Sequence, residues 1–202
     1  MDSHIPVEIQ KDDMKPTRDE IIEAAVSGEF DLLQSFSKNG ADFNEFGPYG
    51  DSLLEDIISL LYFEEKPFRY KIVKTLIEFG ADPNGIGIDP NRPEEANNSP
   101  LTPAMLQMDT EMLKVLLEAG ADPNKVHGFT QNELFYDWAE FDYCYKVFDI
   151  QLPDEPTDED EKDEDSWLIY LDKMAIKYNE RRPDHLFLLR KHGARSIREI
   201  KG

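Results

Sequence analysis

The sequence predicts an all-α protein in which short helix pairs repeat and stack. The main observation is a turn motif, Gly-Ala-Asp-x-Asn, that occurs at 40–44, 80–84 and 120–124, with a degenerate copy at 192–195. An apolar helical run precedes each copy. Such a recurring unit is typical of repeat architectures. One helix pair cannot bury its apolar side alone, so neighbouring pairs must pack against one another.

The best-defined unit runs from Ser99 to Asn124. It contains a Ser-Pro-Leu turn, a short helix, a break at Met108-Asp109 and a second helix that stops at Ala119-Gly120. Glycine after the helix adopts the left-handed C-cap conformation without steric cost. Asp and Asn then satisfy the turn backbone locally. These residues resemble an ankyrin repeat, which implies a solenoid that recognises other proteins through its hairpin fingers and inner helix faces.

We expect a polar N-terminal arm at 1–16 and a single domain at 17–202. Within the domain, four units are predicted at about 19–44, 45–84, 85–124 and 125–202. In the first unit, Ile21, Ile22, Ala24 and Ala25 form an apolar stripe, Gly28 breaks it, and 30–38 forms the second helix. The resemblance covers 19–124 well and 183–195 in part.

The second and third units are longer than the first for different reasons. Ser52 to Lys71 spans 19 positions, whereas the corresponding interval from Ser99 to Glu111 spans 12. We assign the surplus to a longer first helix at 53–63, followed by a link at 64–67. The third unit instead extends its finger at 85–98, whose Gly, Pro and Asn residues indicate exposed turns. Such a loop either contacts a partner or is a tolerated insertion without a role.

The last unit departs from the pattern through an aromatic and acidic insert at about 140–181. The segment 133–150 is rich in aromatic residues, and Phe135, Trp138, Phe141 and Tyr145 have the spacing of one helix face. We predict that this face belongs to the core, with some aromatic side chains left at its edge for a partner. A further helix is expected at 167–181, capped by Ser166, and a last helix at 184–191 opened by Pro183.

An acidic segment, 154–165, precedes that further helix. It has nine acidic residues and one lysine, so it should be solvated and self-repelling. A calcium loop is disfavoured because Lys162, Asp163 and Ile169 stand where an oxygen ligand, a glycine and a bidentate Glu are required. The segment is therefore either a solvated linker or a recognition surface for cations.

Composition narrows the range of partners. The 202-residue chain has 43 acidic and 22 basic residues and a formal net charge of -21, which disfavours nucleic acid and anionic membranes and favours a basic protein. The single cysteine, Cys144, permits no intramolecular disulfide and indicates a reducing compartment. No signal peptide or membrane-spanning run is recognisable. We expect a soluble cytoplasmic protein that is monomeric when free.

Catalytic patterns are weak. The four histidines are scattered and lack metal-site spacing, and Cys144 has no second cysteine for a thiolate site. Cys144 fits better as a buried small apolar residue than as a nucleophile. We therefore expect no catalytic residue, cofactor or metal.

The first functional hypothesis is a non-catalytic immunity or inhibitor protein that binds and neutralises a basic toxin or effector, such as a nuclease. The alternatives are an intracellular scaffold or adaptor, and an acidic mimic of DNA. The candidate partner-binding residues lie on the first finger, the long finger and the acidic segment. They are Phe46, Tyr49, Asp89, Glu94, Glu95, Asp158, Glu159, Asp160, Glu161, Asp163, Glu164 and Asp165.

Overall fold

The computed structural model describes residues 15–87, 91, 99–125 and 133–201, which contain helices and no strand. The predicted all-α class is confirmed. Nearly all of the predicted N-terminal arm and part of the long finger lie outside the described residues. The helices are α1 (Arg18–Val26), α2 (Phe30–Lys38), α3 (Leu53–Leu60), α4 (Lys66–Glu78), α5 (Leu101–Leu106), α6 (Thr110–Glu118), α7 (Phe135–Phe148), α8 (Glu164–Tyr178), α9 (Asp184–Lys191) and α10 (Ile197–Lys201).

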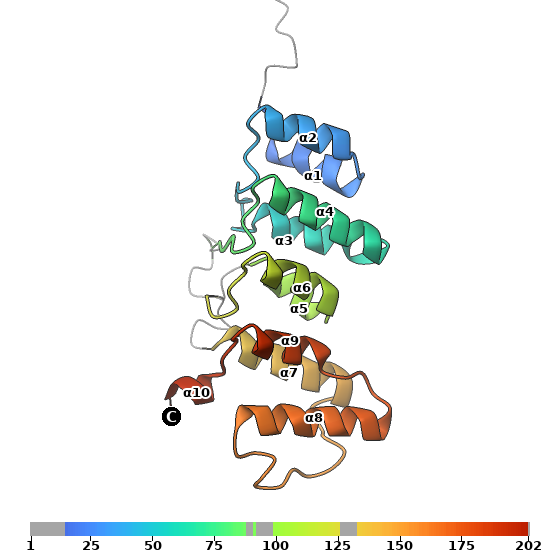
Figure 1. Cartoon of the computed structure of the whole chain (residues 1–202), viewed down its shortest axis with the longest axis vertical. Helices are drawn as coiled ribbons and strands as arrows, with labels where there is room; N and C mark the ends of the chain where they lie inside the picture. The colour runs from blue at the N-terminus through green and yellow to red at the C-terminus, as the bar shows by residue number, and fades with distance from the viewer. Residues whose placement is uncertain (1–14, 88–90, 92–98, 126–132, 202) are drawn as a thin grey trace, which may run out of the picture.

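The helices form pairs that stack along the long axis of the molecule (Figure 1). Helices α1, α3, α5 and α7 pack successively and make up the first-helix row. In the second-helix row, α2 packs on α1, while α4 packs on α6 and α6 on α9. Helix α7 packs against α9, so α8 is inserted between the two members of the last pair and covers the end of the stack opposite α1.

The same corner closes each pair. Gly40, Gly80, Gly120 and Gly193 have φ values of 75°, 102°, 101° and 83°, in the region that favours glycine. In each case the following alanine N–H donates to a carbonyl five residues earlier, at 3.0 Å. The degenerate fourth copy therefore has the geometry of the other three, although an arginine replaces its aspartate.

Asparagine side chains join one corner to the next. Asn44 Nδ2 donates to Gly80 O at 2.9 Å, and Asn44 Oδ1 accepts from Asp82 N at 2.7 Å. Asn124 makes the equivalent bonds to Gly193 O at 2.9 Å and from Arg195 N at 3.1 Å. The Asn of each motif thus positions the following pair, a function that the local turn chemistry did not indicate.

The extra residues of the second unit are shared between two helices. Helix α3 ends at Leu60 and a 3₁₀ turn continues to Phe63. Helix α4 then begins at Lys66 with Pro67 in its first turn, where proline is tolerated. The predicted link at 64–67 is therefore too long, because α4 takes up part of the surplus.

The predicted core face of α7 is wrong in part. Phe135 is buried, but Phe141 and Tyr145 are 59% and 54% exposed. The buried face instead carries Tyr136 and Tyr143, with the Tyr143 ring 5.6 Å from that of His185 on α9. Apolar residues surround this helix on most sides, so the packing of its neighbours decides which side is buried.

The start of α8 also differs from the prediction. Its N-cap is Asp163, whose carboxylate accepts from Ser166 N at 2.7 Å, so Ser166 lies inside the first turn. Tyr170, Leu171 and Met174 of this helix are buried. Helix α9 begins at Asp184 after Pro183, as expected. None of the helices in the described part is long and apolar enough to cross a membrane.

Candidate protein-binding surface

The first finger presents two aromatic side chains on a braced turn. Phe46 is 45% exposed and Tyr49 is 62% exposed. Arg18 donates to the carbonyls of Glu45 and Asp51 at 3.2 and 3.1 Å and pairs with Asp56 at 2.5 Å. The finger is therefore held against α1 and α3, and Phe46 and Tyr49 are displayed on a fixed backbone.

The beginning of the long finger, 85–87, packs directly on the first finger. A Cβ atom at Gly87 would lie 1.8 Å from Gly50 O and 2.8 Å from the Phe46 ring, so only glycine permits this approach. A small hollow beside this contact is lined by Phe43, Phe46 and Ile86. Asp89, Glu94 and Glu95, which were predicted to continue this surface, lie outside the described residues.

The acidic segment does not form one uniform surface. Asp158 and Glu161 are exposed. Asp160 accepts from the Thr157 backbone N at 3.0 Å and from its hydroxyl at 2.6 Å, which lowers the Asp160 pKa. Glu159 pairs with Lys162. Most of these carboxylates therefore remain available to solvent while their backbone is locally ordered.

The last three acidic candidates have structural contacts instead. Asp163 caps α8, and Asp165 pairs with Arg190 at 2.9 Å. Glu164 is 4% exposed. Its carboxyl group interacts with that of Glu140 on α7, so we remove Glu164 from the predicted surface. A polar sequence pattern did not reveal that a helix begins inside the acidic segment.

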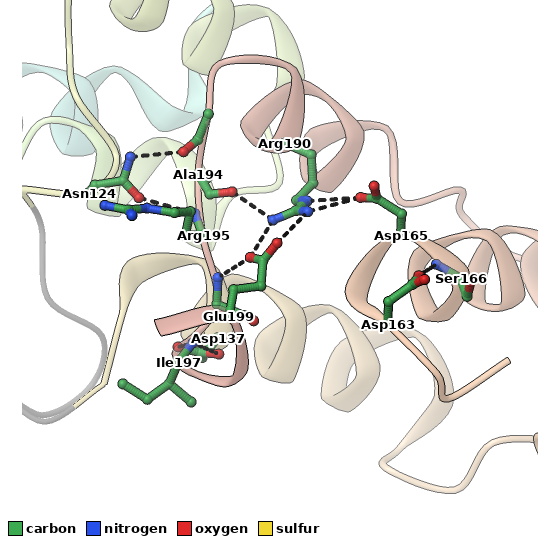
Figure 2. A network of polar contacts seen from close by, with 12 residues as sticks. Asn124, Asp137, Asp163, Asp165, Ser166, Arg190, Ala194, Arg195, Ile197 and Glu199 are labelled. Atoms are coloured by element: carbon green, nitrogen blue, oxygen red, sulfur yellow. Dashed lines mark hydrogen bonds and ion pairs between the residues drawn. The ribbon is translucent and has the colours of Figure 1, made fainter. Parts of the chain in front are cut away.

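Arg190 of α9 connects the helices at the end of the stack (Figure 2). Besides Asp165, its guanidinium donates to Glu199 at 2.6 and 2.8 Å and to Ala194 O at 2.9 Å. It also lies 5.5 Å from the Tyr136 ring centroid. The bonds to Glu199 raise the pKa of Arg190 and lower that of Glu199. This network joins α7, α8, α9 and α10 and fixes one end of the acidic segment.

The other end of the acidic segment is fixed by Asp154. Its carbonyl accepts from the Tyr170 hydroxyl at 2.5 Å. Its carboxylate accepts from Lys177 at 2.6 Å and from the Tyr178 hydroxyl at 2.8 Å, and both bonds lower the Asp154 pKa. The segment therefore runs alongside α8, anchored near both ends of that helix.

Exposed apolar residues also lie on the first-helix row. Leu60, Leu106, Phe141 and Tyr145, here called the apolar strip, are 57%, 39%, 59% and 54% exposed. Lys146 Nζ on α7 donates to Leu106 O at 2.6 Å. Arg69 Nη1 donates to Tyr62 O at 3.0 Å and lies 3.5 Å from Gln107 Oε1. These bonds hold the C-terminal ends of α3, α5 and α7 near one another, and the residues of the strip come from these three helices.

Charge differs between the two rows. The first-helix row contains eight acidic and two basic side chains, whereas the second-helix row contains five acidic and eight basic ones. Both basic residues of the first row, Arg18 and Lys146, are paired with carboxylates of that row. The first-helix row, which carries the apolar strip, is therefore the more acidic of the two rows.

Comparison with known proteins does not identify the chain. No protein-family model matches it, and a search of curated proteins finds no significant similarity. The chemistry of its own surface is therefore the basis for a functional proposal.

A second exposed aromatic site was missed in the sequence. Phe63 is 92% exposed and packs edge-on against Tyr62, with ring centroids 4.8 Å apart. Beside them lies a cleft of about 440 Å³ whose other lining residues are Arg69, Gln107, Asp109 and Arg181. Its floor is the buried ion pair between Arg69 and Asp109. The apolar and aromatic residues 61–63 were predicted as the end of the helix at 53–63. The sequence pattern therefore did not indicate that Phe63 is exposed.

The described residues contain no group of three or more His, Cys, Asp or Glu side chains arranged to hold a metal ion. Burial raises the pKa of Cys144 to about 12, which keeps its thiol protonated near neutral pH. Burial likewise lowers the pKa of His185 to about 3, so this imidazole is neutral at ordinary pH. Neither side chain has the properties of an activated nucleophile or base.

Proposed function

We propose that this chain is a non-catalytic protein-binding module with the architecture of an ankyrin-repeat array. The observation that carries the proposal is the repetition of one corner, with its Gly φ value, its alanine hydrogen bond and its asparagine link, across successive helix pairs. Such a stack is rigid and presents side chains from consecutive units on one continuous surface.

The proposed binding surface is the apolar strip together with the first finger. Aromatic side chains that are exposed on a fixed scaffold are frequent anchors of protein interfaces. Phe141 and Tyr145 satisfy this description on α7, and Phe46 and Tyr49 do so on the first finger. The surrounding acidic side chains favour a partner that combines apolar contacts with lysine and arginine.

The partner that fits best is a basic toxin or effector, for which the chain would act as a cytoplasmic immunity or inhibitor protein. A formal net charge of -21 accelerates encounter with a cationic surface and covers it after binding. A nuclease is one such partner because its active surface must attract phosphates. The exposed part of the acidic segment, including Asp158 and Glu161, would contribute to this attraction.

An adaptor is the second candidate. Phe63 lies at the tip between α3 and α4, whereas Tyr49 lies on the first finger before α3, and both are largely exposed. Two separate aromatic sites favour a protein that holds two partners together. An inhibitor would need one of these sites for a single partner.

The test begins with copurification of the full chain from its native cells, identification of bound proteins and measurement of their affinity for the purified chain. We expect a basic partner whose binding weakens roughly tenfold or more when Phe141 and Tyr145 are both changed to alanine. Ile176→Ala on α8 is the matched control because Ile176 is 60% exposed outside the proposed surface.

Affinity should also fall steeply with salt, because attraction between exposed charges is screened. For an inhibitor, one equivalent of the chain should suppress the activity of the partner. An acidic partner, or equal effects of the double variant and Ile176→Ala, would refute the proposed surface. Two proteins bound simultaneously, without inhibition of either, would favour the adaptor.

A further inference from the structure

Two glutamates meet between α7 and α8. The Glu140 carboxyl group of α7 interacts with the Glu164 carboxyl group in the first turn of α8. Glu164 is 4% exposed, although it belongs to the most acidic part of the chain. An ionised carboxylate has only acceptors, so a hydrogen bond between two such groups requires one of them to carry a proton.

Among the described residues, the surroundings offer this pair one neutral hydrogen-bond donor and no ion pair. Trp167 Nε1 donates to Glu140 Oε1 at 2.6 Å. Within the described part of the chain, this indole is the one side-chain donor bonded to either carboxyl group. Glu164 Oε2 is buried without a partner, as is the hydroxyl of the nearby Tyr136. In the described part of the chain, neither glutamate forms an ion pair. An unprotonated pair would therefore bury two like charges.

We propose that Glu140 operates a proton-dependent latch: while Glu140 carries a proton, its contact with Glu164 holds the start of α8 on α7, and loss of that proton releases it. The acidic segment leads directly into α8, with Asp163 as the N-cap. Release of the first turn of α8 would therefore also free the C-terminal part of the acidic segment. The latch links the position of this charged surface to pH.

The direction of the pH effect follows from the pKa of Glu140. Burial, together with the neighbouring Glu164 carboxyl, raises this pKa from 4.5 to about 8. The folded chain therefore binds more protons than the unfolded chain between these two values. The stabilising contribution is fully present below the ordinary glutamate pKa and is lost as the pH rises through about 8.

The other charged groups around the pair do not reverse this direction. Asp137 on α7 also has a pKa raised by burial. Arg190 of α9 stays charged and is occupied by Asp165 and Glu199. Arg198 of α10 attracts Glu140 and lowers its pKa, but less than burial and Glu164 raise it. Cys144 and Tyr136, whose pKa values are both raised, stay neutral.

Trp167 provides a local reporter because its indole contacts Glu140. In the full-length chain with Trp138→Phe, Trp167 is the single remaining tryptophan. We would record its fluorescence from about pH 5 to about pH 9, a range that separates an ordinary glutamate from one with a raised pKa. The latch predicts a titration with a midpoint well above the ordinary glutamate value, which Glu140→Gln abolishes and Glu164→Gln shifts towards the ordinary value.

Hydrogen exchange supplies the second readout. After correction for intrinsic rates, amides in the first turns of α8 should exchange roughly tenfold faster above the midpoint, whereas those of α5 should not change. Glu164→Gln should keep α8 protected across the whole range because its amide group donates without titrating. Glu55→Gln is the control, since Glu55 also has a raised pKa but lies on α3.

A flat Trp167 fluorescence curve over this range would overturn the proposal, even if every glutamine variant failed to fold. Loss of the titration in Glu55→Gln would do the same, because the signal would then report a global change. Uniform acceleration of exchange in α5 and α8 would also contradict a latch that acts on α8.

Discussion

The side chain of Asn84 is hydrogen-bonded to the backbone of Gly120, 36 residues further along the chain. Asn84 Nδ2 donates to Gly120 O at 2.8 Å, and Asn84 Oδ1 accepts from Asp122 N at 2.8 Å. One amide thereby satisfies a donor and an acceptor of the next corner. The equivalent bonds of Asn44 and Asn124 make this a property of the stack, in which each corner depends on the preceding motif.

Asn84→Ala should reduce the free energy of unfolding by roughly 1–3 kcal/mol, because it leaves two backbone groups of the next corner without partners. Urea denaturation followed by circular dichroism measures this change. Asn39→Ala is the matched control, since Asn39 is an exposed residue at the end of α2. Equal stability of the two variants would show that the asparagine links do not hold the pairs together.

The buried ion pair between α4 and the start of α6 provides a second prediction. Asp109 caps α6 through Met112 N at 3.3 Å, accepts from the Tyr70 hydroxyl at 2.8 Å and pairs with Arg69. Asp109→Ala should cost roughly 3–5 kcal/mol because the Arg69 charge is left buried without its partner. Combining Asp109→Ala with Arg69→Met should cost less than the sum of the two single changes.

Arg182→Ala is the control for this measurement. Arg182 pairs with Asp172 at 2.7 Å, but its side chain is 53% exposed. Exposed pairs contribute about 0–1 kcal/mol. If Asp109→Ala costs no more than Arg182→Ala in the same denaturation experiment, the buried pair is not a main stabilising contact.

Stability should depend on pH through Glu55. Burial and the nearby Asp51 raise the Glu55 pKa from 4.5 to about 8. The Glu55 Oε2 atom is buried without a hydrogen-bond partner. The folded state therefore holds a proton that the unfolded state releases. Stability should fall by roughly 1.4 kcal/mol for each pH unit between these two values.

Glu55→Gln should remove this part of the pH dependence in denaturation curves collected across the window. Glu23→Gln on α1 changes an exposed carboxylate and should leave the slope unchanged. The contribution of Glu140 has the same sign and should persist in Glu55→Gln. A slope that is identical in the native chain and in Glu55→Gln would show that Glu55 is not protonated in the fold.

The end of the stack should depend on Arg190. Arg190→Ala removes bonds to Asp165, Glu199 and Ala194 O and should lower the free energy of unfolding by roughly 1–3 kcal/mol. Amides of α10 should lose protection from hydrogen exchange before those of α3. Lys191→Ala, at an exposed neighbouring position, is the control. Unchanged protection of α10 in Arg190→Ala would contradict this function of the network.

Local sequence patterns were sufficient for much of the fold. The glycine at each corner was predictable because the helix ends there with a residue in the left-handed backbone conformation, which glycine adopts without steric cost. The break at Met108-Asp109, the extent of α2 and the start of α9 after Pro183 also agree with the structure. These features depend on contacts within a few residues, so composition and spacing are enough to determine them.

The candidate surface was predictable only in part. The exposure of Phe46 and Tyr49 agrees with the prediction of a finger that displays aromatic residues. Phe63 was missed because an aromatic residue at a helix end has no sequence signal that separates burial from exposure. Glu164 was misplaced because its burial depends on α7, a different helix, where it interacts with Glu140.

By itself, the sequence determined the helical class, the recurring corner and the concentration of negative charge, because each is a local or additive property of the chain. Tertiary structure alone decided that Tyr143 rather than Phe141 is buried, that Asn84 supports Gly120, and that Glu140 meets Glu164. In each of these cases the deciding partner lies on another helix. Periodicity identifies the sides of a helix, but the neighbouring helices determine which side leaves the solvent.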